Sequence, residues 1–398
     1  MKTAIQKAIS DIKAGKMVLL LDDENRENEA DLVMAAQYVR PEDITFMRDH
    51  TCGIVCLALS QDNARRLQIP LMTSSNHARH QTPFGVSFDA ATGISTGVSS
   101  FDRARSIRLA ADFESAPQDI VMPGHIFPLL ADDRGVFGRQ GHTEGSVDLM
   151  RLAGLQQAAA IAEVMLPDGT MARGQDLLAF AQHYNFSVVS VQQLMEYRLM
   201  HEDWLNQVAS SQLMTHYGRF DVAVYQSEYD QLEHVVLSVP ADSHAPLVRI
   251  HSECLTGDVF GSVRCDCGQQ LDFALRSVAK QGGAVLYCRQ EGRGIGLVNK
   301  IRAYELQDQG CDTVEANEKL GFAADCREYS VAIKMLQRLG WQRVRLMTNN
   351  PHKIAALTAA GIDVVDRVPI EVSAHHHCRQ YLQTKKDKLN HLLQLEEC

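Results

Sequence analysis

Three cysteines in the second half of the chain have a spacing that suits a metal ion. Cys254 is followed, after ten residues, by Cys265 and then Cys267. Three thiolates can bind Zn²⁺ and leave its fourth tetrahedral position to water, which is how a catalytic zinc differs from a closed structural one. Half of a zinc ribbon, or three unrelated cysteines, is the alternative that the spacing leaves open. The pattern favours metal-assisted hydrolysis.

An acidic run near the N-terminus is a second candidate metal site. It directly follows a short apolar run, residues 17–22, that we expect to be a buried strand. Carboxylate oxygens at the end of a strand are ligands that Mg²⁺ prefers while it keeps waters and a substrate oxygen. A solvated charged surface is the alternative. The charged residues of the run are Asp22, Asp23, Glu24, Arg26, Glu27, Glu29 and Asp31.

Two further segments carry groups that could bind phosphates or move protons. Residues 139–144 combine arginine, histidine and glutamate, although a single histidine such as His142 is more often structural. Residues 289–296 contain two arginines and three glycines, but the Gly-x-Gly-x-Gly spacing lies deep within a domain and is not a dinucleotide fingerprint. The arginines of that segment still suit a polyphosphate.

Strands and helices must position these groups, and their expected pattern predicts an α/β fold of mixed α+β type in two domains. Apolar runs predict strands, and helical spacing predicts helices, in both halves. The expected strands are residues 17–22, 53–59, 86–89, 159–164, 187–191, 220–225, 235–238, 284–287 and 344–347. The expected helices are residues 41–50, 147–153, 176–184, 192–200 and 330–339. Residues 201–212 are polar and weakly periodic, so we expect domains at 1–200 and 201–398.

Composition limits the classes of function. The formal net charge of −10 argues against a general nucleic-acid binder, and no apolar stretch approaches the roughly 20 residues that a membrane span needs. Ten cysteines in a chain without a signal peptide favour reduced thiols and a cytoplasmic location over a disulfide framework. We therefore expect small-molecule substrates, with neither nucleic acid nor membrane as a partner.

Segments of the first half, including Asp-Asp-Glu-Asn-Arg-Glu-Asn-Glu-Ala-Asp (22–31) and Gly-His-Thr-Glu (141–144), resemble 3,4-dihydroxy-2-butanone 4-phosphate synthase. The resemblance covers about residues 1–200. It implies conversion of D-ribulose 5-phosphate to L-3,4-dihydroxy-2-butanone 4-phosphate and formate. It also implies that Glu27 and His142 bind Mg²⁺ or Mn²⁺, and that His125 and Glu163 are further acid and base residues. The implied ribulose 5-phosphate contacts are Arg26, Glu27, Asp31, Arg139, Gln140, Gly141, His142, Thr143 and Glu163.

Segments of the second half, including Arg-Ile-His-Ser-Glu-Cys (249–254) and Arg-Cys-Asp-Cys-Gly (264–268), are similar to GTP cyclohydrolase II. The match spans roughly residues 208–398. It implies hydrolysis of GTP to 2,5-diamino-6-(5-phosphoribosylamino)pyrimidin-4(3H)-one, formate and pyrophosphate. It also implies Zn²⁺ on Cys254, Cys265 and Cys267, with a water that attacks C8 of guanine as fourth ligand, and Mg²⁺ on the GTP phosphates. The implied GTP contacts are Arg249, Ile250, His251, Ser252, Glu253, Gln270, Glu291, Gly292, Arg293, Thr313, Thr348 and Lys353.

The same resemblance implies catalytic roles for three other residues of the second half. Asp325 would be the proton acceptor, Tyr304 would orient the attacking water, and Arg327 is the nucleophile that the family pattern proposes. A guanidinium has a pKa above about 12, so we expect Arg327 to neutralise charge on the α-phosphate instead. Together the halves resemble the fused, bifunctional riboflavin-pathway enzyme, which implies a homodimer. The alternatives are that one domain has lost its activity, or that the chain is a zinc-stabilised regulatory or nucleic-acid-binding module.

Four residues depart from the two family patterns. Arg134 stands in a loop that usually carries glycine, Gln140 replaces a small residue, Met214 replaces a proline and Cys326 replaces an acidic residue. Glycine at such loop positions gives backbone freedom, so we expect the first two changes to affect rate and not residue roles. The tract 375–378, three histidines and a cysteine, could bind a metal, but we expect a variable tail loop there.

Overall fold

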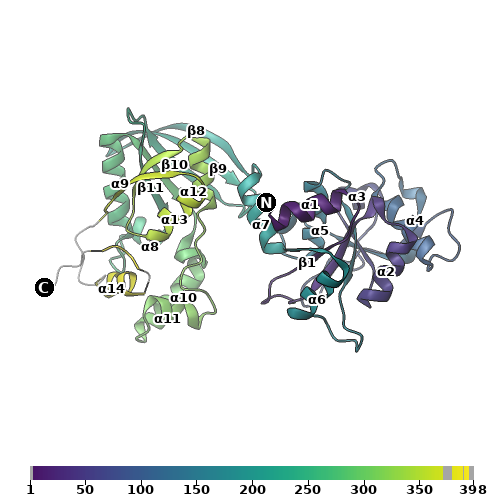
Figure 1. Cartoon of the computed structure of the whole chain (residues 1–398). Helices are drawn as coiled ribbons and strands as arrows, with labels where there is room; N and C mark the ends of the chain where they lie inside the picture. The colour runs from purple at the N-terminus through teal and green to yellow at the C-terminus, as the bar shows by residue number, and fades with distance from the viewer. Residues whose placement is uncertain (1–2, 371–378, 389, 394–398) are drawn as a thin grey trace. The chain divides into compact units, whose positions relative to one another are not determined.

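The computed structural model describes residues 3–370, 379–388 and 390–393. Contacts between Cα atoms divide the chain into two compact units, Met1–His201 and Glu202–Cys398, and Figure 1 shows that each unit is built around its own sheet. The histidine and cysteine tract at 375–378 lies outside the described residues. None of the described helices is long and apolar enough to cross a membrane.

The first unit contains a seven-stranded sheet with strand order β4-β5-β3-β6-β2-β1-β7. Neighbouring strands are antiparallel except in the β3–β5 and β1–β7 pairs. The strands are β1 (Val18–Leu21), β2 (Ala30–Ala35), β3 (Cys56–Leu59), β4 (Phe88–Ala90), β5 (Ile120–Leu130), β6 (Ala158–Glu163) and β7 (Ser187–Ser190). The helices are α1 (Ala4–Lys13), α2 (Pro41–Thr51), α3 (Gln61–Arg66), α4 (Ser100–Ala111), α5 (His142–Leu152), α6 (Gln175–Tyr184) and α7 (Val191–His201).

Strand β1 shows how the sequence produces a layered arrangement. Its residues Val18, Leu19 and Leu20 are fully buried, which requires cover on both faces because successive side chains of a strand point to opposite sides. Leu19 belongs to a core that also contains residues of α2, α4 and α6. On the other face, a Cβ added at Gly145 of α5 would lie 2.9 Å from Leu20 Cδ2. Glycine at that position therefore lets α5 approach the sheet closely.

The second unit contains another seven-stranded sheet, with strand order β14-β13-β11-β12-β10-β9-β8. The first four strands in this order are parallel, and the last three form an antiparallel meander. The strands are β8 (Leu205–Thr215), β9 (Gly218–Ser227), β10 (Glu233–Val239), β11 (Leu247–Ser252), β12 (Gly283–Cys288), β13 (Arg343–Met347) and β14 (Asp363–Val368). The helices are α8 (Leu255–Asp258), α9 (Cys267–Gln281), α10 (Gly296–Asp308), α11 (Thr313–Lys319), α12 (Ser330–Arg338), α13 (Pro351–Ala359) and α14 (Arg379–Asp387).

The parallel strands of the second unit end at the segments that carry its candidate chemistry. Cys254 follows β11, Arg289 to Glu291 follow β12, and Thr348 follows β13. The carboxyl ends of parallel strands lie at one edge of a sheet, where ligands of open α/β sheets usually bind. The topology thus gathers side chains that are about 100 residues apart in the sequence.

The predicted α/β fold of mixed type is confirmed, and every predicted strand and helix overlaps an observed one. The polar stretch 201–212, where we placed the domain boundary, contains a strand that was not predicted, since β8 begins at Leu205 and pairs with β9 along its whole length. After Leu205, the residues of β8 up to Met214 are exposed on both faces, so they lack the apolar alternation that reveals a strand. Helix α5 also begins five residues before the predicted helix, at His142.

Candidate functional sites

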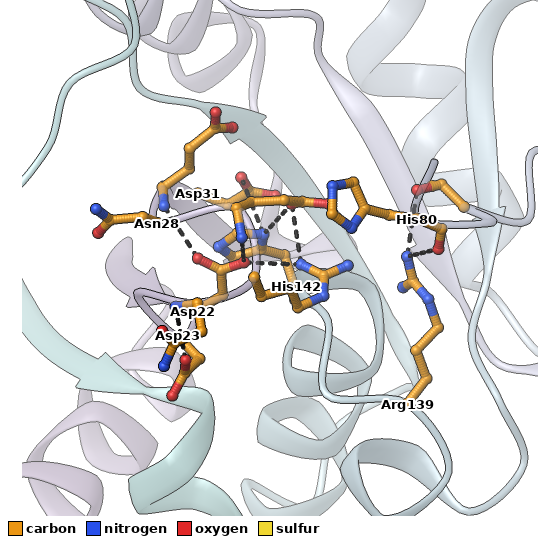
Figure 2. A network of polar contacts seen from close by, with 12 residues as sticks. Asp22, Asp23, Asn28, Asp31, His80, Arg139 and His142 are labelled. Atoms are coloured by element: carbon orange, nitrogen blue, oxygen red, sulfur yellow. Dashed lines mark hydrogen bonds and ion pairs between the residues drawn. The ribbon is translucent and has the colours of Figure 1, made fainter. Parts of the chain in front are cut away.

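Asp22 organises the acidic run into a folded loop. Its side chain is fully buried at the end of β1. Asp22 Oδ2 accepts hydrogen bonds from Arg26 Nη1 at 2.8 Å and from the backbone N of Glu27 at 3.2 Å, and Oδ1 accepts one from the backbone N of Glu29 at 2.9 Å. Figure 2 shows these contacts around Asp22. The acidic run is therefore a folded loop and not a solvated charged surface.

The loop and the start of α5 bring together a group that could bind a metal ion. Ligand atoms of Asp22, Glu27 and His142 all lie within 4.8 Å of one another. Nδ1 of His142 is 3.6 Å from Glu27 Oε2 and 3.8 Å from Asp31 Oδ1. His142 Nε2 and Asp31 Oδ1 are buried and have no hydrogen-bond partner among the described residues. Buried polar atoms without partners, beside hard carboxylate oxygens, fit a divalent cation.

The charges of this group are strongly coupled. The hydrogen bond with His142 lowers the pKa of Glu27 to about 2. Burial raises the pKa of Asp31 to about 7. Burial alone would lower the pKa of His142, but Asp31, Glu27 and Asp22 outweigh it and raise that pKa to about 9. Without a metal, the imidazolium of His142 and the guanidinium of Arg26, which pairs with Asp22 and Glu27, therefore supply positive charge to this cluster of carboxylates.

Arg139 lies on the other side of the same cavity, next to His80 in Figure 2. Its guanidinium donates to Glu144 Oε2 at 2.9 Å, to the carbonyl oxygen of His80 at 3.1 Å and to Thr82 Oγ1 at 3.2 Å. Glu163 also lines the cavity, because the β2–β6 register pairs it with Asp31.

The structure gathers most, but not all, of the predicted residues of the first site. Arg26, Asp31 and Thr143 line the cavity, but Gln140, Gly141 and His125 are not among its lining residues. Gln140 instead contacts Met195 of α7, with 3.4 Å between Nε2 and Sδ. Gly141 is the residue that precedes α5. Further lining residues that were not predicted include Arg79, His80, Thr82 and Arg173.

His125 forms a separate pair with Asp89. The two are joined by Nδ1 and Oδ2 at 2.7 Å, and the backbone N of His125 donates to Asp89 Oδ1 at 3.0 Å. The side chain of His125 is 45% exposed. A carboxylate on one ring nitrogen orients an imidazole for proton transfer at the other.

The three cysteines of the second unit converge as the metal hypothesis requires. Their sulfur atoms lie within 4.8 Å of one another, and the distance between the Cys254 and Cys265 sulfurs is 3.6 Å. Two thiolates with Zn–S bonds of about 2.3 Å at tetrahedral angles would be about 3.8 Å apart. Gly257 packs on them, since a Cβ there would lie 3.1 Å from the Cys265 sulfur. The soft donor set and its spacing fit Zn²⁺.

The thiols share their protons unevenly. Hydrogen bonds from Cys265 and Cys267 depress the pKa of Cys254 far below its ordinary value. The hydrogen bond to Cys254 raises the pKa of Cys265 to about 11, and the pKa of Cys267 is raised as well. The structure therefore favours a thiolate at Cys254 even without a metal.

The cysteine loop is fixed by buried polar contacts. The backbone N of Cys254 donates to Asp258 Oδ2 at 3.0 Å. Asp266, between the other two cysteines, forms a buried ion pair with Lys385 of α14 at 2.8 Å. Gln270 donates to Asp266 and accepts from Arg249.

A cavity beside the cysteines contains about half of the predicted GTP contacts. Its lining includes Ser252, Glu253, Glu291, Gly292, Arg293, Thr313, Tyr304 and Arg327. The backbone of this wall is unusual, because Arg293 has a φ of 64° between two glycines that also have positive φ. A side chain held in this region costs about 1–3 kcal/mol and is typical of functional loops. A Cβ on Gly294 would lie 2.7 Å from the carbonyl oxygen of Cys326, so glycine is required there.

The other predicted residues of this site do not line the cavity. Arg249, Ile250, His251, Gln270, Thr348 and Lys353 are buried and are not among its lining residues. Lys353 Nζ donates to the carbonyl oxygen of Ile250 at 2.7 Å, and burial lowers the Lys353 pKa well below its ordinary value. Asp325 is not a lining residue either, and its carboxylate pairs with the guanidinium of Arg327, which does line the cavity.

Lys300 is a buried cation of this site that was not predicted. Its ammonium lies 3.2 Å from the Cys254 sulfur and 2.7 Å from Glu291 Oε1. Lys300 lies in a segment, residues 299–310, that resembles the family, but the resemblance gave it no role.

Both units match known families. The family model described as 3,4-dihydroxy-2-butanone 4-phosphate synthase matches residues 6–197, and the model described as GTP cyclohydrolase II matches residues 206–369. The riboflavin biosynthesis protein RibBA of Synechocystis sp. is 48% identical, over 98% of this chain and 71% of that protein. RibBA of Aquifex aeolicus is also 48% identical, over 98% of this chain and 97% of its own.

A solved structure resembles most of the chain. It is the crystal structure of RibBX, described as a two-domain 3,4-dihydroxy-2-butanone 4-phosphate synthase from A. baumannii. It is 32% identical, with a TM-score of 0.68, and the match covers 93% of this chain and all of that one.

Proposed function

The chain belongs to the RibBA family of bifunctional riboflavin biosynthesis enzymes, with 3,4-dihydroxy-2-butanone 4-phosphate synthase and GTP cyclohydrolase II domains, and we propose that each unit performs its reaction at the site described above. The first unit converts D-ribulose 5-phosphate to L-3,4-dihydroxy-2-butanone 4-phosphate and formate. The second hydrolyses GTP to the diaminopyrimidinone, formate and pyrophosphate. The observation that carries the proposal is the presence of two chemically different donor sets, one of hard oxygen and imidazole atoms and one of thiols, in different units.

In the first site, Asp22, Glu27 and His142 would bind Mg²⁺ or Mn²⁺, which would stabilise negative charge on the oxygens of an enediolate. Loss of C4 as formate requires enolisation, loss of water, a skeletal shift and hydrolysis, so protons must move at several carbons. Glu163 lines the cavity and His125 carries an oriented imidazole, and both are suited to these transfers. Arg139 would hold the phosphate, because it is a cation that lines the cavity.

In the second site, Cys254, Cys265 and Cys267 would bind Zn²⁺, which would supply the Lewis acidity for attack of water on C8 of guanine. Arg293 and Arg327 line the same cavity and would bind the phosphates with Mg²⁺. Tyr304 lies near the cysteines, since its hydroxyl is 3.2 Å from Thr256 Oγ1, and it would orient the attacking water. The Arg327 guanidinium would neutralise the α-phosphate as pyrophosphate leaves.

We further propose a cytoplasmic homodimer. A three-thiolate site requires reduced cysteines, which the cytoplasm maintains. Exposed apolar side chains near His125 support the dimer: Val121 and Met122 of β5 are 49% and 40% exposed, and Val98 and Phe101 are 59% and 62% exposed. A second copy that covers these residues could also bring its own His125 toward the cavity of the first copy. Within a single chain, His125 does not line that cavity.

Formate release tests the assignment. The purified protein, with Mg²⁺ present and bound zinc measured, is expected to release formate from GTP alone and from ribulose 5-phosphate alone. Cys265→Ser should abolish release from GTP and spare the other reaction, and Glu27→Ala should do the reverse. Cys311→Ser and Glu114→Ala are the matched controls, because neither residue lies in a proposed site. Formate from only one substrate, with zinc fully bound, would mean that the other unit is inactive.

A further inference from the structure

The proposed zinc site has an unbalanced charge that the chain must compensate. Three thiolates and one Zn²⁺ carry a net charge of −1, and the Cys254 side chain is largely buried. A buried net charge is costly unless an opposite charge lies close to it. In the described part of the chain, Lys300 is the only cation within hydrogen-bond distance of any of the three sulfurs.

Lys300 is held in one position by the residues around it. Only 8% of Lys300 is exposed. Glu291 Oε1 accepts from Lys300 Nζ at 2.7 Å, and Glu291 Oε2 accepts from the backbone N of Leu255 at 2.6 Å. The carboxylate therefore joins the lysine to the residue that follows Cys254. The Tyr304 ring, 5.8 Å away, adds a cation–π contact.

The contact is asymmetric among the three sulfurs. Lys300 Nζ donates to Cys254 at 3.2 Å, and the hydroxyl of Thr256 lies 3.7 Å from the same sulfur. No described lysine or arginine donates to Cys265 or Cys267. A charged donor withdraws electron density from the sulfur that accepts it, so Cys254 would donate less to a bound metal than the other two thiolates.

We propose that Lys300 is a positioning residue that keeps the zinc site electrophilic by hydrogen bonding to the Cys254 thiolate. This inference rests on the proposed function of the second unit. Three thiolates make zinc a poor Lewis acid, and a fixed ammonium on one of them reverses part of that effect. Lys300 acts through Cys254 and Glu291, and does not itself contact the guanine ring.

Cobalt substitution measures this effect directly, since the energy of the sulfur-to-cobalt charge-transfer band depends on the electron density at the sulfur. The comparison uses the full-length protein loaded with Zn²⁺ or Co²⁺. Lys300→Met should retain the metal, shift the band to lower energy, and lower kcat for formate release from GTP about 10- to 100-fold with little change in KM. Lys300→Arg keeps the charge and should recover much of both readouts.

Arg302→Gln is the matched control, because Arg302 is an exposed cation on the same helix whose side chain hydrogen-bonds to Asn299 and not to a cysteine. It should match the wild type in spectrum, zinc content and rate. If Lys300→Met loses its metal, Lys300→Gln provides the same test. Metal loss in both neutral variants but not in Lys300→Arg would support the charge role.

Three results would overturn the inference. An unchanged cobalt spectrum with a raised KM would make Lys300 a direct GTP contact. Metal loss in the arginine variant as well would make its role purely structural. A Lys300→Met variant with the cobalt spectrum and kcat of the wild type would show that Lys300 has no role in the zinc site. Each of these results differs from a failure of the proposed function. In that case the zinc-loaded wild-type protein would release no formate from GTP.

Discussion

Asp325 and Arg327 neutralise each other in the second site, and this pairing restricts what either residue can do. Arg327 Nε donates to Asp325 Oδ1 at 2.8 Å, and a second guanidinium nitrogen donates to the other oxygen. Burial alone would raise the pKa of Asp325, but Arg327 and Arg293 outweigh it and lower that pKa. A carboxylate with a lowered pKa is a weak base. We infer that a phosphate must first engage Arg327 before Asp325 can accept a proton.

A pH-dependent metal affinity follows from the charge state of His142. The imidazole must lose its proton to bind a metal, and its pKa is raised to about 9 in the folded protein. Between pH 7.5 and 8.5, Asp31 with its pKa of about 7 is mostly ionised and His142 is mostly protonated, so each Mg²⁺ bound to the first unit should release nearly one proton, from His142. The dissociation constant should fall about tenfold per pH unit there, as measured by titration calorimetry in buffers of different ionisation enthalpy.

His77→Asn is the control for this titration. His77 is exposed and bonds to Ser75, outside the cavity, so its replacement should leave proton release unchanged. His142→Asn should remove the pH dependence along with most of the affinity. Proton-independent binding by the wild type would show that His142 is not a ligand.

Residues in continuous motifs could be predicted from the sequence, and residues from separate loops could not. The cysteines and the acidic run 22–31 can be recognised from residue type and spacing alone. Arg79 and Arg173 reach the first cavity from loops that carry no motif, and only the tertiary fold places them there. Lys353, to which the resemblance gives a GTP contact, is buried and donates to the carbonyl oxygen of Ile250, and its GTP contact stays a prediction.

At the scale of elements, helix α14 holds the cysteine loop from the far end of the chain. Lys385 and Asp266 are 8% and 3% exposed, and Lys385 outweighs burial in lowering the pKa of Asp266. Lys385→Met would leave a buried carboxylate unpaired, which costs about 3–5 kcal/mol. We expect this variant to lose zinc to a chelator at least about tenfold faster than the wild type, and to lose activity on GTP but not on ribulose 5-phosphate.

Lys386→Met is the matched control for α14. Lys386 is the next residue and is exposed, so its variant should retain zinc as the wild type does. Equal zinc retention in both variants would mean that α14 does not stabilise the loop.

The elements that were predicted correctly are those whose burial produces a clear apolar pattern. Strands β1, β6 and β12 are almost entirely buried and were visible as apolar runs. Strand β8 is an edge strand with little burial, and its hydrogen bonds with β9, not its side chains, define it. Backbone pairing leaves little trace in a sequence, which is why no strand was predicted within residues 201–212.

For the whole molecule, the division into two units predicts that the activities are separable. A fragment of residues 1–201 should release formate from ribulose 5-phosphate, and a fragment of residues 202–398 should release it from GTP, each at a kcat close to that of the full chain. The reason is that each unit contains a complete sheet and all the donors of its proposed metal site. Formate assays on the two purified fragments check this.

Intrinsic fluorescence provides the folding control for the fragments. Both tryptophans of the chain, Trp204 and Trp341, lie in the second unit. The urea midpoint read by fluorescence should therefore agree between the full chain and the 202–398 fragment. A folded fragment that is inactive alone but regains activity when mixed with the other would show that the two units depend on each other.

The pairing of β1 with β7 also determines when the first site can form during synthesis. Strand β1, which ends at the buried Asp22, lies between β2 and β7, and β7 comprises residues 187–190 near the end of the first unit. The acidic loop can therefore reach its final arrangement only after almost the whole unit has left the ribosome. The remaining 197 residues (398 − 201) then take roughly 10–40 s at about 5–20 residues per second. Each new polypeptide could thus begin to make the four-carbon phosphate before its GTP site exists.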